Sequence, residues 1–266
     1  MVTAGKLALV LLAIILFSAC KPAGLIYTRD GKIECGGNGK AIILKNNPAA
    51  INPTFDEMVA FIKADATDYR DYIKSGDNAY VCSDFAEDVH NNAEAAGIKA
   101  GWVALTFSST GEGHALNSFE TTDRGLIYID CTNGGRDDEE NKASSRDTVA
   151  YIETGKRYGI LNIDVVASST YDYYTLQYDF YTERKKAWQD YQNRLKSFNT
   201  EVDRYNKEIS GKVFTYGSPE EQKISAWKEE LQEQERTLER LEKELGQYWY
   251  ESEFSEYTVE DVLIHW

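Results

Sequence analysis

Cysteine and histidine are scarce in this chain of 266 residues, which contains four cysteines and three histidines. No two cysteines form a Cys-x-x-Cys pair, so the sequence favours neither a zinc finger nor an iron–sulfur protein. The length excludes a miniprotein held together by disulfides. We therefore expect no cofactor and no metal, and we expect the four cysteines to have separate roles: Cys20, Cys35, Cys82 and Cys131.

Positive charge is also in short supply. Acidic residues outnumber basic residues by 44 to 29, and the formal net charge is −15. This balance argues against a nucleic-acid partner, because phosphate neutralisation requires an excess of lysine and arginine. Apolar residues make up 42% of the chain, which is ordinary for a globular protein and argues against extensive disorder.

The longest apolar run lies at the N-terminus and is too short for a transmembrane helix. Lys6 precedes an unbroken run from Leu7 to Phe17, whereas a membrane-spanning helix needs about 20 residues. We interpret residues 1–19 as a signal peptide. Its last residues and the one after it, Phe17-Ser18-Ala19-Cys20, resemble the lipobox of prokaryotic lipoproteins, although leucine is commoner than phenylalanine at the first position.

That resemblance implies an exported protein anchored to a membrane by a lipid on Cys20, at the cell surface or in the periplasm of a prokaryote. An uncleaved anchor and ordinary signal-peptide cleavage remain alternatives.

Residues 20–175 have the pattern of an α+β domain. Thr54 and Glu57 form a predicted capping box before an apolar helical face. A second helix is predicted from Cys82 to about Ala96, where Gly97 ends it. Weak strands are expected at 25–28 and 41–44, and further strands at 102–107, 114–120, 126–131, 148–152 and 158–166. The polar segment 133–147 is a predicted loop, and the tyrosines of 171–181 favour packing over a sugar platform.

Residues 176–248 change to a helical period. Apolar side chains recur at spacings of three and four from Trp188 to Ile209 and again from Ile224 to Tyr248. Ser218-Pro219 marks the second helix start after a glycine-bounded turn. Two such seams predict an antiparallel coiled-coil hairpin with a possible protein partner, and an intermolecular coiled coil is the alternative. Residues 249–266 are expected to return to the core as a strand.

Three side chains carry the predicted chemistry. Cys82 begins a helix, where backbone N–H groups and the helix dipole favour a thiolate. His114 begins one strand and Asp130 ends the next. A hairpin symmetric about residue 122 places His114 opposite Asp130, so that the carboxylate orients the imidazole. Packing the Cys82 helix on that face of the sheet is then expected to bring the sulfur to the second ring nitrogen.

This Cys-His-Asp order resembles the transglutaminase-like superfamily. The resemblance lies in residues 80–132 and includes Cys-x-x-Phe-Ala at a helix start, Gly113-His114, and an aspartate 16 residues after the histidine. It implies a papain-like core with Cys82 as nucleophile, His114 as general base and acid, and Asp130 as orienting carboxylate. The Cys82 backbone N–H and either Asn78 or Tyr80 are candidate oxyanion donors.

The expected function is a thiol enzyme at the cell envelope, a peptidase, amidase or transglutaminase-type acyl transferase acting on peptide or protein amide bonds. A non-catalytic binding or scaffold lipoprotein is the alternative, because a buried cysteine and a His–Asp pair also occur as structural elements. A disulfide between Cys35 and Cys131 stays open, whereas Cys82 is expected to be free. His90 and His265 are interpreted as structural.

Overall fold

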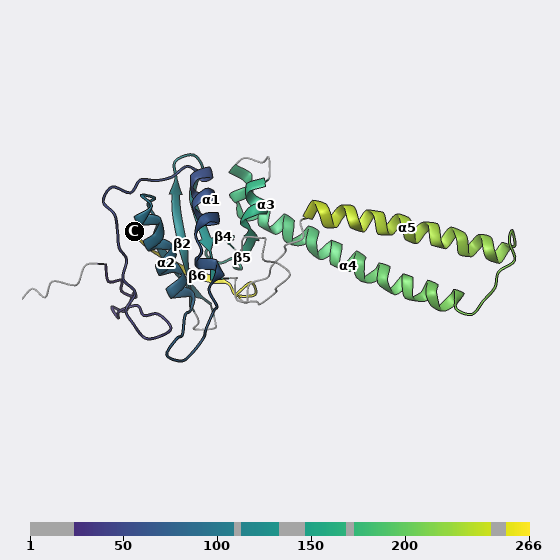
Figure 1. Cartoon of the computed structure of the whole chain (residues 1–266), viewed down its shortest axis with the longest axis horizontal. Helices are drawn as coiled ribbons and strands as arrows, with labels where there is room; N and C mark the ends of the chain where they lie inside the picture. Colours follow the sequence, from purple (N-terminus) through teal and green to yellow (C-terminus); the bar gives the residue numbers. More distant parts are fainter. Residues whose placement is uncertain (1–23, 109–112, 133–146, 169–172, 246–253) are drawn as a thin grey trace, which may run out of the picture.

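The computed structural model describes residues 24–108, 113–132, 147–168, 173–245 and 254–266. They form an α+β structure with an antiparallel sheet of six strands, and two long helices extend away from it (Figure 1). Among the described residues, no helix is both long and apolar enough to cross a membrane. Cys20 and residues 1–19 lie outside the described residues, as does most of the predicted loop 133–147.

The sheet has the strand order β5-β4-β3-β2-β1-β6. Its strands are β1 Gly101–Phe107, β2 Gly113–Thr121, β3 Gly125–Asp130, β4 Thr148–Tyr151, β5 Gly159–Asn162 and β6 Val259–His265. The C-terminal strand predicted from the sequence is confirmed, since β6 pairs with β1. The two edges of the sheet meet at one end, where Tyr158 N donates to Tyr257 O and Val259 N donates to Lys156 O, both at 2.9 Å. The sheet is therefore strongly curled.

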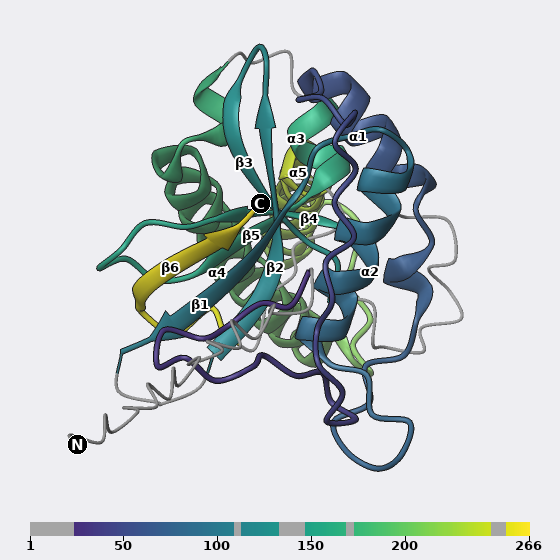
Figure 2. The same ribbon diagram turned by 90° about the vertical axis from the view of Figure 1, so that its left-hand side faces the viewer.

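Helices cover one face of this sheet and extend from it. They are α1 Phe55–Ala64, α2 Cys82–Ala95, α3 Ile163–Ser168, α4 Tyr178–Ile209 and α5 Pro219–Leu245, with short 3₁₀ turns at Thr67–Tyr69 and Tyr173–Leu176. Figure 2 shows α1 and α2 side by side along the same side of the strands. Alternate β2 residues point to the two faces, so that Phe119 packs among α1 and α2 whereas Leu116 packs with Tyr158 inside the curl.

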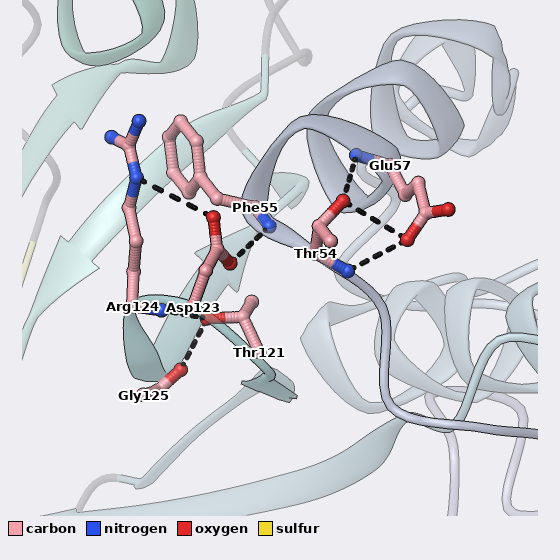
Figure 3. A network of polar contacts seen from close by, with 7 residues as sticks. All are labelled: Thr54, Phe55, Glu57, Thr121, Asp123, Arg124 and Gly125. Atoms are coloured by element: carbon pink, nitrogen blue, oxygen red, sulfur yellow. Dashed lines mark hydrogen bonds and ion pairs between the residues drawn. The ribbon is translucent and has the colours of Figure 1, made fainter.

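Helix α1 begins as the sequence predicts. The Thr54 side chain accepts from Glu57 N, and the Glu57 carboxylate accepts from Thr54 N at 2.8 Å, which completes the capping box. The tip of the β2–β3 hairpin adds a second cap, because the Asp123 carboxylate accepts from Phe55 N at 2.7 Å (Figure 3). The Arg124 guanidinium lies 4.1 Å above the Phe55 ring. The hairpin tip and α1 therefore fix one another.

Two predicted strand regions differ from the structure. Residues 163–166 were expected to continue the strand from Tyr158, but α3 begins at Ile163. The Asn162 side chain accepts from Asp164 N at 2.7 Å, and this local cap starts a helix despite the β-branched residues that follow. The weak strands at 25–28 and 41–44 form only isolated bridges, such as Leu25 with Ile43.

Helices α4 and α5 pack against one another within the chain in opposite directions. Arg184 contacts Glu244 O near one end, and Trp227 Nε1 donates to Glu201 at 2.9 Å further along. Each predicted seam position within these two helices is buried or half-buried. With 32 residues at about 1.5 Å per residue, α4 alone is about 48 Å long.

Candidate active site

Cys82 is the first residue of α2, and this helix start is tied to the N-terminal segment. The Asp84 carboxylate accepts from Val81 N at 2.9 Å and from Gly37 N at 2.8 Å. A Cβ atom at Gly36 would lie 1.9 Å from Asp84 Oδ1, so only glycine fits at this approach. These contacts hold the segment around Gly36 and Gly37 beside the start of α2. This contact was not predicted, although the two adjacent glycines are the sequence feature that could have indicated it.

His114 and Asp130 form a buried hydrogen-bonded pair. His114 Nε2 donates to Asp130 Oδ2 at 2.8 Å, and both side chains are fully buried. The predicted register was wrong by two residues, since Ser118 pairs with Tyr128 instead of Leu126. The two side chains still share a face because a shift of two preserves the alternation of the strand. They therefore meet diagonally across the hairpin.

The hairpin tip explains the register. Thr121 pairs with Gly125, and its hydroxyl accepts from Arg124 N at 3.1 Å and donates to Gly125 O at 2.8 Å. Gly125 has a φ of +75°, which glycine adopts without steric cost. These contacts centre the turn on residue 123, one residue later than the predicted centre.

Asp130 has a complete set of hydrogen-bond donors. Besides His114, the buried Tyr158 hydroxyl donates to Oδ2 at 2.6 Å. The Thr132 hydroxyl and backbone N–H donate to Oδ1 at 2.5 and 2.9 Å. Four donors thus hold the carboxylate and fix its orientation toward the imidazole. Neither Tyr158 nor Thr132 was predicted as part of the site, and Tyr158 reaches Asp130 only because the sheet is curled.

The expected packing of the helix on the His114–Asp130 face was wrong. Helix α2 lies on the opposite face, where Asn117 Nδ2 donates to Ala86 O at 2.8 Å. Cys82 nevertheless reaches His114, because its sulfur lies at the start of β2 and interacts with the His114 side chain and with the Ala115 backbone. The contact is made where β2 begins, and at this edge of the sheet the first residue of α2 can reach a side chain on the other face.

The electrostatics of the three residues favour a thiolate–imidazolium pair. Burial alone would raise the pKa of the Cys82 thiol, but the hydrogen bond and charge of His114 lower the pKa below its usual value. Burial opposes the protonated imidazole, yet the charge and hydrogen bond of Asp130 raise the pKa of His114. Burial likewise opposes the Asp130 carboxylate, but His114, Thr132 and Tyr158 lower its pKa to about 2.

A cavity of about 510 Å³ opens beside the sulfur. Cys82 and His114 both line it, so the thiol is accessible although the imidazole is buried. One wall comes from residues 27–30 and Glu34, and strands β1, β2 and β6 contribute most of the rest of the lining, including Leu263 and His265. Its volume suits a side chain or short peptide segment.

Tyr80 and Asn78, the other candidate oxyanion donors, differ in their surroundings. The Tyr80 hydroxyl donates to Asp88 at 2.6 Å and its backbone N–H donates to Ile73 O, so Tyr80 has no donor left for an oxyanion. Asn78 is exposed. Tyr72, which sequence analysis missed, hydrogen-bonds the Cys82 sulfur, and its ring stacks on Phe85.

Among the described residues, Cys35, Cys131 and His90 lie apart from the triad, whereas His265 lines the cavity. Cys35 is exposed and Cys131 is buried, and both are free thiols, so they form no disulfide. Cys131 packs on the helix-covered face, opposite Asp130, as its neighbouring position in the strand predicts. His90 is fully buried, with Nε2 at 3.1 Å from Asn46 Oδ1.

Searches of protein-family models, curated proteins and solved structures find no match to this chain. Within the part of the chain that the structure describes, no group of three His, Cys, Asp or Glu side chains is arranged to hold a metal ion.

Proposed function

We propose that the chain is a thiol acyl-transfer enzyme in which Cys82 is the nucleophile, His114 the general acid and base, and Asp130 the orienting carboxylate. The arrangement of these three side chains supports this proposal most strongly. One nitrogen of His114 is bonded to Asp130 at 2.8 Å, and the imidazole also interacts with the thiol. A nucleophile, a base and a group that orients the base are the components that acyl transfer requires.

The reaction follows from these positions. The Cys82 thiolate attacks the carbonyl carbon of a peptide or isopeptide amide, and the electron pair of the carbonyl moves to its oxygen. When the tetrahedral adduct collapses, the C–N bond breaks and His114 gives its proton to the leaving amine. Water then attacks the thioester, with His114 accepting its proton, which releases the acid and the thiol. An amine in place of water gives transglutaminase-type crosslinking.

The fold supports the same proposal in a general way. A cysteine at a helix start beside a curled antiparallel sheet is consistent with a papain-like, transglutaminase-like core. We propose further that α4 and α5 form a coiled-coil hairpin, on the basis of their seam positions, and that Cys20 is lipidated, on the basis of Phe17-Ser18-Ala19-Cys20. The protein would then act at the cell envelope.

The proposal is tested by alkylation of the native protein with iodoacetamide, followed by peptide mass spectrometry that reports each cysteine separately. We expect rapid modification of Cys82 at pH 7 and a large loss of rate in His114→Ala. The exposed Cys35 is the internal control, since its rate should not depend on His114. An unreactive Cys82, or one that reacts equally fast without His114, would contradict the assignment.

A binding or scaffold protein remains the second candidate, because of the turn between α4 and α5. Val213 and Tyr216 there are 99% and 95% exposed, which is unusual for large apolar side chains and suits contact with a protein partner. This function does not require a reactive thiol, so the alkylation experiment separates the two candidates.

A further inference from the structure

We propose that the cavity beside Cys82 selects a substrate carrying a positively charged side chain near the attacked carbonyl, and that Glu34 is the residue that selects it. This inference rests on the proposed function, because it takes the cavity to be the substrate site. It adds a substrate class, one with an ammonium or guanidinium group, and a specificity residue.

Glu34 is held close to the start of the Cys82 helix by its own backbone and by its neighbour. Its N–H donates to Ile26 O at 3.1 Å, and its carbonyl accepts from Ile42 N at 2.9 Å. The next carbonyl, that of Cys35, accepts from the Ser83 hydroxyl at 3.3 Å. Since Ser83 follows Cys82, these contacts hold the Glu34 backbone beside the start of α2, and Glu34 lines the same cavity as Cys82.

The Glu34 carboxylate has no hydrogen-bond or ion-pair partner among the described residues, although it is half-buried. The other charged groups of the cavity are compensated, because Asp30 pairs with Lys32 at 2.6 Å and Asp261 pairs with Arg29 at 2.5 Å. Burial raises the pKa of Glu34, and the charge of Asp30 raises it further. A cation entering the cavity would supply the missing counter-charge, whereas an anion would meet repulsion.

A second observation shows that the same cavity is prepared for a reacting group. His114 and Cys82, which interact with one another, both line this cavity. The nucleophile, the imidazole and the unpaired carboxylate therefore all border one space of about 510 Å³. A substrate whose carbonyl reaches the sulfur brings its neighbouring side chains within range of Glu34.

The test uses three small methanethiosulfonates that differ in charge and need no known substrate. The thiolate displaces methanesulfinate and forms a mixed disulfide in each case. The trimethylammonium-ethyl reagent is cationic, the sulfonatoethyl reagent is anionic, and methyl methanethiosulfonate is neutral. Rates at Cys82 are measured on the full chain by peptide mass spectrometry. We expect the cationic-to-anionic rate ratio to fall on the order of tenfold in Glu34→Gln, and less in high salt.

The control is Glu260→Gln, which removes one negative charge from an exposed position of β6 that does not line the cavity. Its rate ratio should match that of the wild type. An unchanged ratio in Glu34→Gln, or the same change in both variants, would overturn the inference. The neutral reagent tests the proposed function separately from the role of Glu34. If its rate of reaction with Cys82 is the same in the wild type and in His114→Ala, the triad is rejected, whatever the ratios measured with the charged reagents.

Discussion

Removal of the Tyr158 hydroxyl gives a quantitative test of how Asp130 is held. Tyr158→Phe keeps the ring, which packs against Phe107 and Phe254 and beside His114. It deletes one buried hydrogen bond of 2.6 Å to a carboxylate. Hydrogen bonds to charged groups contribute about 1.5–3 kcal/mol, so we expect the free energy of unfolding at pH 7 to fall by about 2 kcal/mol.

The pH dependence of this loss has a defined sign. The folded-state pKa of Asp130 is lowered to about 2, while an unfolded aspartate has a pKa of about 3.9. A lowered pKa contributes stability that is present above the unfolded value and is lost as the pH falls through the folded value. Tyr158→Phe raises the pKa of Asp130 in the folded state. The difference in the free energy of unfolding between wild type and variant should therefore be constant above about pH 5 and should become smaller below about pH 4.

Urea unfolding across this pH range measures the effect, and Tyr151→Phe is the matched control. Tyr151 is also buried, but its hydroxyl donates to the neutral carbonyl of Thr175 at 2.5 Å. Removal of the Tyr151 hydroxyl should lower the free energy of unfolding by about 1 kcal/mol, and this loss should not become smaller at low pH. Equal losses for the two variants with the same pH dependence would refute the assignment of Tyr158 as a partner of the Asp130 carboxylate.

Three further predictions concern Cys82, Gly36 and Cys20. Because His114 lowers the pKa of Cys82, alkylation at Cys82 should stay fast at pH values where glutathione slows, and the His114→Ala profile should shift to higher pH; coincident profiles would contradict the ion pair. Gly36→Ala should lower the free energy of unfolding by roughly 1–3 kcal/mol in urea, because the new Cβ clashes with Asp84, whereas Lys40→Ala on the exposed surface should change it little. Cys20→Ser should move the protein from the membrane fraction to the soluble fraction, and retention in the membrane would contradict the lipid anchor.

Local signals in the sequence were sufficient for most of the elements. The capping box of Thr54 and Glu57 gave the start of α1, and the positive-φ Gly97 follows the end of α2. The seam spacing gave α4 and α5, since it repeats over many turns. The predicted strand at residues 163–166 was wrong. Its β-branched side chains favour a strand, but the hydrogen bond from Asp164 N to the Asn162 side chain starts a helix there. A short segment is decided by one hydrogen bond, which a pattern does not weigh well.

The His114–Asp130 pair was predictable because it depends on alternation along a strand. His114 and Asp130 share a face under any even shift of the hairpin register, so the error of two residues left their pairing intact. The positions of Tyr158 and Glu34 depend instead on contacts between distant parts of the chain. The curl of the sheet places Tyr158, and the hydrogen bond from Ser83 to the Cys35 carbonyl holds the segment that contains Glu34. No local pattern in the sequence encodes either contact.

The position of Cys82 shows why the wrong helix face did not remove the contact. A helix packed on one face of a flat sheet cannot reach side chains on the other face, and Asn117 and Ala86 place α2 on the face opposite His114. The sulfur escapes this limit because it belongs to the first residue of α2 and lies where β2 begins. The imidazole can therefore stay inside the curl, bonded to Asp130, while the thiol stays at the cavity. The structure therefore combines a buried imidazole with a thiol at the cavity, an arrangement that suits the acyl transfer proposed above.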